Sequence, residues 1–132
     1  MSWAALVTWI VTAGGGFVLL AIWLKHGGMQ QRESGRIRPA LVLTHFALAA
    51  AGLVLWIVYV ASDSSAVAWI AFALLLVVAL LGFTMFGIWA SRSRTDERAA
   101  EHRFPVPVVG LHGLIAATTL VLVVLAAAGV GS

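Results

Sequence analysis

Four long runs of apolar residues, none of them containing a charged side chain, constrain the fold of this chain more than any other feature. They cover residues 3–24, 40–61, 66–90 and 106–130. Each run has 22 to 25 residues, and a helix needs roughly 20 to cross the hydrocarbon core of a bilayer. Because 62% of all residues are apolar and the mean hydropathy is +1.05, we expect an integral membrane protein. The predicted fold class is all-α: one membrane domain over residues 1–132, folded as a four-helix transmembrane bundle.

The charged residues predict how this bundle is oriented. All eight Lys and Arg residues lie in the segments 25–39 and 91–105, which join the first run to the second and the third run to the fourth. The remaining connection, 62–65, carries only Asp63. The positive-inside rule then places both termini outside and both basic loops in the cytoplasm, as expected for a multi-pass protein of the inner membrane. We therefore interpret the net charge of +3 as a sign of topology and of contact with lipid headgroups, and not of nucleic-acid binding.

Two absences narrow the possible functions. The chain has no cysteine, which excludes disulfides, thiolate catalysis, iron–sulfur clusters and cysteine zinc sites. Proton-coupled transporters normally place a carboxylate within the bilayer. Every acidic residue of this chain falls outside the apolar runs, which argues against a small multidrug transporter. The acids are Glu33, Asp63, Asp96, Glu97 and Glu101.

The two halves of the sequence resemble each other at an offset of 66 to 67 residues. Segments 16–23 and 82–89 both begin with Gly-Phe and end with Ile-Trp, and a histidine follows an arginine by nine residues in both the second and the fourth run. The repeat units are helical hairpins, about 3–61 and 66–130. Because two helices separate the copies, both hairpins cross the membrane in the same sense, which predicts a pseudo-two-fold axis along the membrane normal. We expect the tryptophans at the ends of the runs to form aromatic belts at the two membrane surfaces.

His45 and His112 are the histidines of the apolar runs, and they occupy equivalent positions of the repeat. They follow Pro39 and Pro105 by six and seven residues, so both lie roughly 10 Å inside the helices that carry them. An ionisable side chain at such depth marks a functional site by default. Two level histidines on diagonal helices of a bundle suit the two axial positions of a haem iron.

Other readings of the pair stay open. The histidines could be neutral and hydrogen-bonded between helices. They could also hold a copper or zinc ion, although two imidazoles alone make a poor zinc site.

Further residues are candidates for binding such a cofactor. Two glycines at the depth of the histidines would let a ring approach the backbone, two alanines one turn further along leave clearance, and arginines of the basic loops could bind propionates. These candidates are Gly16, Gly82, Ala49, Ala116, Arg36, Arg38, Arg92 and Arg103.

With four apolar helices and this histidine pair, the chain resembles the small four-helix b-type cytochromes of membranes, the cytochrome b561-like class. The resemblance implies an electron carrier or oxidoreductase component, with haem b held by His45 and His112, that exchanges electrons with a quinol or quinone, superoxide or a redox protein. Members of that class commonly carry two histidine pairs, whereas the outer half of this chain has none, so we expect one haem. A non-redox structural or accessory subunit is the alternative, a channel or carrier is less favoured, and a homodimer is compatible with each.

Overall fold

Four long helices make up most of the molecule. The computed structural model describes residues 1–131, and within them it contains α1 (Ser2–Lys25), α2 (Pro39–Ser62), α3 (Ser65–Ile88) and α4 (Val106–Ala127), with no strand. All four are long and apolar enough to cross a membrane. The prediction of an all-α four-helix bundle is confirmed. The fourth helix ends at Ala127, before the expected end at residue 130.

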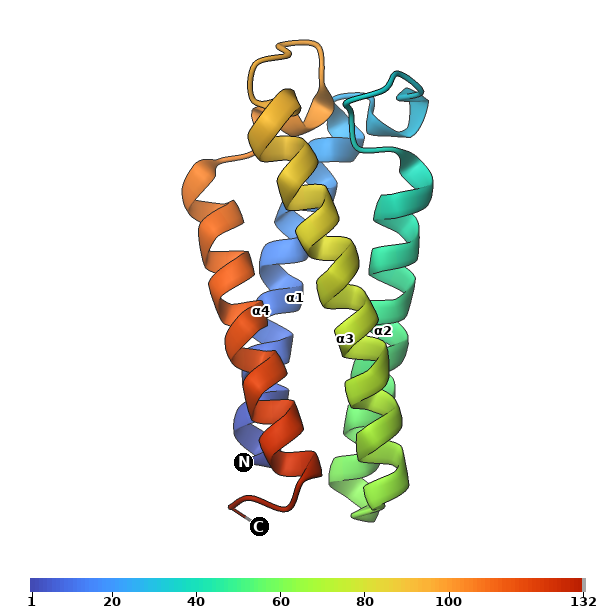
Figure 1. Cartoon of the computed structure of the whole chain (residues 1–132), viewed down its shortest axis with the longest axis vertical. Coiled ribbons are helices and arrows are strands. Elements are labelled where there is room, and N and C mark those ends of the chain that lie inside the picture. Colours follow the sequence, from blue (N-terminus) through green and yellow to red (C-terminus); the bar gives the residue numbers. More distant parts are fainter. Residues whose placement is uncertain (132) are drawn as a thin grey trace.

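The helices run alternately up and down, so that both termini lie at one end of the bundle (Figure 1). We call this the terminal end; it also holds the tight turn between α2 and α3, where Asp63 has a positive φ of 55°. The opposite end, formed by residues 26–38 and 94–105, is called the basic end. Prolines begin two of the helices there, since Pro39 is the first residue of α2 and Pro105 is the N-cap of α4.

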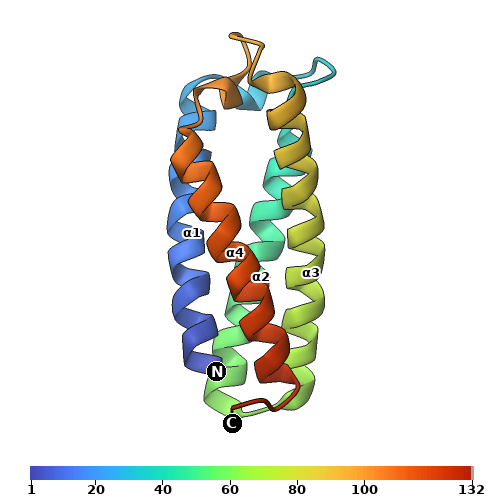
Figure 2. The ribbon, with the colours of Figure 1, turned by 60° about the vertical axis from the view of Figure 1, so that its left-hand side comes forward.

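The two sequence halves exchange helices in the bundle. α2 packs mainly against α3, and α1 packs mainly against α4, so each half contributes one helix to each close pair. α2 and α4, which carry the histidines, lie diagonally across the bundle. The pair α1–α4 and the pair α2–α3 diverge toward the basic end (Figure 2).

The hydrophobic core fills the terminal half. It is built around Trp9 and Trp56, with small or aliphatic partners from α3 and α4. At the basic end Trp23 and Trp89 are also buried, at 1% and 5% exposure. The aromatic-belt prediction is therefore wrong for these four tryptophans. Because each helix is apolar on every side, the sequence does not reveal which face turns inward.

Between this core and the basic end the interior is loosely filled. Among the residues that the structure describes, the helix segments 10–22, 39–51, 79–88 and 106–118 contain no buried residue. At about 1.5 Å per residue these segments span roughly 15 Å of the bundle. The bundle thus has a tight terminal half and an open stretch above it.

A buried carboxylate closes the basic end. Glu101, in the short helix η3 (Ala100–Arg103), is fully buried and accepts hydrogen bonds from the backbone N–H of Ile37 at 2.6 Å, from Ser93 Oγ at 2.7 Å and from Gln31 Nε2 at 2.8 Å. Gln31 in turn accepts a bond from the backbone N–H of Ala100. Because these partners come from both basic loops, Glu101 ties the loops together over the open stretch.

Candidate metal centre

His45 and His112 face each other across the bundle. Their ring centroids are 6.5 Å apart and their planes make an angle of 63°. The rings come from the diagonal helices α2 and α4, and both are half-buried near the middle of the open stretch. The structure thus brings together, at one depth, the two residues that the repeat makes equivalent.

Each imidazole is held by a backbone carbonyl of the helix beside it. His45 Nδ1 donates to the carbonyl of Val78 on α3 at 3.0 Å, and His112 Nδ1 donates to the carbonyl of Thr12 on α1 at 2.9 Å. A carbonyl can only accept, so the hydrogen sits on Nδ1 and a neutral ring keeps its lone pair on Nε2. Neither Nε2 has a hydrogen-bond partner within residues 1–131. Metal-binding histidines commonly show this arrangement.

Glycines make room for both rings. A Cβ atom added at Gly16 would lie 3.1 Å from His112 Cε1, and one added at Gly82 would lie 3.4 Å from His45 Cε1. We had expected these glycines to let a macrocycle approach the backbone, and nothing in the structure tests that role. Their observed contact is with the imidazole carried by the other half of the sequence.

The spacing of the two rings can be compared with that of two imidazoles bound to one metal atom. Bonds between a metal and imidazole nitrogen are about 2 Å long, and the nitrogen lies about 1 Å from its ring centre, so two opposed ligands have their ring centres about 6 Å apart. The observed 6.5 Å is close to that value. Residues 1–131 contain no group of three or more His, Asp or Glu side chains that could hold an ion. An ion between these rings would have two imidazoles as its ligands from the described part of the chain.

No protein-family model, curated protein or solved structure matches this sequence. The likeness to b-type cytochromes rests on the residues of this chain alone. The geometry of the two imidazoles is consequently the main evidence about function.

The two candidate alanines lie one turn closer to the terminal end than the histidines. Ala49 packs against the hydrophobic core, and Ala116 is half-buried on α4. Their proposed role in giving clearance to a cofactor stays a prediction.

The arginines gather at the basic end. Arg36 donates from Nε to Asp96 at 2.8 Å and from one terminal nitrogen to Glu33 at 3.0 Å. The hydrogen bond from Arg36 lowers the pKa of the Asp96 carboxyl, and the same bond raises the pKa of Arg36. Arg92 lies against Gly35, and Arg103 is an exposed residue of η3. Arg36 is thus already neutralised by carboxylates.

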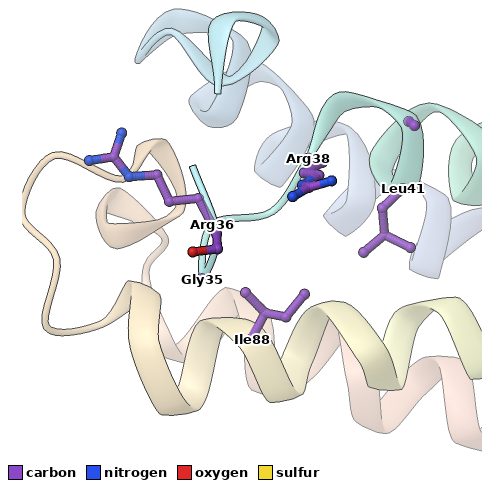
Figure 3. A pocket seen from close by; sticks show the side chains of 7 residues that line it. Gly35, Arg36, Arg38, Leu41 and Ile88 are labelled. Atoms are coloured by element: carbon purple, nitrogen blue, oxygen red, sulfur yellow. The ribbon is translucent and has the colours of Figure 1, made fainter. Parts of the chain in front are cut away.

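A pocket of about 310 Å³ opens beside these loops, between the start of α2 and the end of α3. Figure 3 shows Arg38 and Leu41 on one side and Ile88 on the other, with the guanidinium of Arg36 turned away toward the second basic loop. Leu41 lies one helical turn before His45. The pocket is therefore within about 6 Å of the histidine level along the helix axis.

Three features of the site were missed from the sequence. The carbonyl partners of the histidines, at Thr12 and Val78, are 66 residues apart, so the repeat offset could have paired them. The indole nitrogens of Trp23 and Trp89 are buried without a hydrogen-bond partner, and the repeated Ile-Trp frame marks both residues. No sequence signal pointed to the burial of Glu101.

Proposed function

We propose that this protein is a membrane electron carrier that binds one haem b between His45 and His112. The observation that supports this most directly is the pair itself: two level imidazoles, 6.5 Å apart, each anchored through Nδ1 so that Nε2 remains to bind a metal. The helix segments around the pair contain no buried residue among those described, which favours this level of the bundle for a macrocycle. Bundle interiors of this kind commonly hold cofactors.

The residues of the site would have separate roles in binding the haem. Haem b supplies one-electron chemistry at its iron. His45 and His112 would hold the iron, and a haem held by both imidazoles would supply electron exchange without binding a substrate. The carbonyls of Thr12 and Val78 fix the tautomer and orientation of the rings and increase their basicity.

The partners follow from the orientation we propose. The protein would span the inner membrane of the cell, and the positive-inside rule places its basic end in the cytoplasm. The single haem then lies nearer the cytoplasmic face. A quinol, superoxide or a redox protein would then exchange electrons with it from that side. Reporter fusions at residue 30 and at the C-terminus test this orientation: the first should be active only in the cytoplasm and the second only outside.

Purification of the protein from cells supplied with haem tests the main proposal. A reduced-minus-oxidised spectrum of a b-type cytochrome, with about one haem for each chain, is the expected result. A redox titration should then fit a single one-electron step, because only one histidine pair is present.

One observation favours a second candidate, a non-redox structural or accessory subunit. The Nδ1 hydrogen bonds of His45 and His112 join α2 to α3 and α4 to α1, as histidines that only hold helices together would. This candidate predicts a colourless protein in which substitution of either histidine lowers thermal stability and changes no cofactor content.

A further inference from the structure

Two buried hydrogen-bond donors at the basic end have no partner. Trp23 Nε1 and Trp89 Nε1 are the two buried side-chain polar atoms within residues 1–131 that make no hydrogen bond. An indole nitrogen can only donate, so its missing partner must be an acceptor. Buried polar groups without partners are rare in native structures, so both donors are candidates to bind an acceptor from outside the chain.

The two tryptophans occupy equivalent places above the histidine pair. Trp23 follows Gly16 by seven residues, and Trp89 follows Gly82 by seven. Seven residues make about two helical turns, so each tryptophan shares a helix face with the glycine that lies against an imidazole. This separation corresponds to about 10 Å along the helix axis. Since α1 and α3 both run toward the basic end, both tryptophans lie between the histidine level and the loops that cover this end.

The space between the imidazoles and the indoles belongs to the loosely filled stretch of the bundle. The histidines lie within this stretch and the tryptophans lie at its end toward the basic loops, and the helix segments between these two levels contain no buried residue among those described. A ligand held at the histidines and extending about 10 Å toward the basic end would reach the level of the two indoles.

The loops of the basic end hold these indoles in place. Gly28 lies directly on the Trp23 ring, where an added Cβ would overlap the indole. The guanidinium of Arg94 lies over the ring of Trp89, 5.3 Å from its centroid. Arg36, an expected partner for propionates, is instead bonded to Asp96 and Glu33. The indoles are the buried donors still without an acceptor.

We infer that Trp23 and Trp89 bind the two propionate carboxylates of the haem, each through its indole N–H. This inference rests on the proposed haem at His45 and His112. It assigns binding residues to the edge of the cofactor that the histidines do not touch. A haem carries its two propionates on one edge, so two equivalent donors on one side of the iron match two equivalent acceptors. Hydrogen bonds to ionised carboxylates are about twice as strong as neutral ones.

Haem with free propionates and haem dimethyl ester, in which both carboxylates are methylated, together provide the test. The full-length protein is stripped of haem, reconstituted with each compound and titrated for affinity. The unmodified protein should bind the free acid at least about tenfold more tightly than the ester. Trp23→Phe and Trp89→Phe should each weaken binding of the free acid roughly tenfold, keep the bis-histidine spectrum, and in combination abolish the preference for the acid.

Trp56→Phe is the matched control, because Trp56 is equally buried but donates to the carbonyl of Ser2 in the terminal half. It should keep both the affinity and the preference. If the phenylalanine variants do not fold, the comparison of acid and ester in the unmodified protein decides alone. Haem binding through the histidines with no preference for the acid would overturn the assignment and leave the proposed function standing, whereas absence of haem binding would overturn both.

Discussion

His45 and His112 are related by the internal repeat, and so are the atoms that hold them: His45 is bonded to the carbonyl of Val78 and His112 to that of Thr12, 66 residues earlier. The two imidazoles therefore have the same tautomer and the same kind of anchor. Two identical ligands on opposite sides of a pseudo-two-fold axis are suited to one atom on that axis.

Gly16 should tolerate no side chain without disturbing His112. A methyl group at this position would meet His112 Cε1 at 3.1 Å, so Gly16→Ala should displace the ring and weaken haem binding several-fold. Gly14→Ala is the control, since an added Cβ there meets nothing within 4 Å. Absorption spectra and haem titrations of both variants check this prediction, and equal effects of the two substitutions would contradict it.

Glu101 should contribute strongly to the stability of the basic end. Glu101→Ala removes three hydrogen bonds to a buried carboxylate and leaves the backbone N–H of Ile37 without an acceptor, while Ser93 Oγ and Gln31 Nε2 each keep a backbone carbonyl. It should lower the free energy of unfolding by about 3 kcal/mol. Glu97→Ala removes an exposed carboxylate of the same loop and should change it by less than about 0.5 kcal/mol. Thermal or denaturant unfolding in detergent measures both, and a similar small loss in the two variants would refute the proposed role of Glu101.

The ion pair between Arg36 and Asp96 should make a small, pH-dependent contribution to the stability of the folded protein. Because the hydrogen bond from Arg36 lowers the pKa of Asp96, the folded state binds the proton less tightly than the unfolded state does. The stabilisation is thus present above the unfolded pKa of about 3.9 and is lost as the pH falls through the lower pKa of the folded state. Melting temperatures of the unmodified protein and Asp96→Asn should differ slightly at pH 7 and converge near pH 2. A difference that grows at low pH would be the wrong sign.

Much of the fold was predictable because its determinants are local. The length of each apolar run sets a membrane-spanning helix, and short connections force neighbouring helices to be antiparallel. The level placement of His45 and His112 followed from the repeat. The helix faces that turn inward were not predictable, because a helix that is apolar on every side has no distinct apolar face. For the same reason the prediction of aromatic belts was wrong for four buried tryptophans, Trp9, Trp23, Trp56 and Trp89.

The closure at the basic end was beyond sequence reasoning for a different cause. Glu101 meets Ile37 and Gln31 across 64 and 70 residues, and nothing in the composition of two polar loops indicates that one carboxylate is fully buried. The roles of Gly16 and Gly82 were only partly anticipated. Their depth was expected, but their contact with the imidazoles of the opposite half depends on the exchange of helices between the halves.

The proposal depends most directly on one measurement, the reduced-minus-oxidised absorption spectrum of the purified protein, repeated for His45→Ala and His112→Ala. We predict a b-type spectrum that is lost or converted to that of a five-coordinate haem in each variant. His26→Ala is the control, because His26 is exposed at the end of α1 and bonds only to the carbonyl of Ile22, so it should keep the full spectrum. A colourless unmodified protein, or a b-type spectrum that both histidine variants retain, would contradict the account.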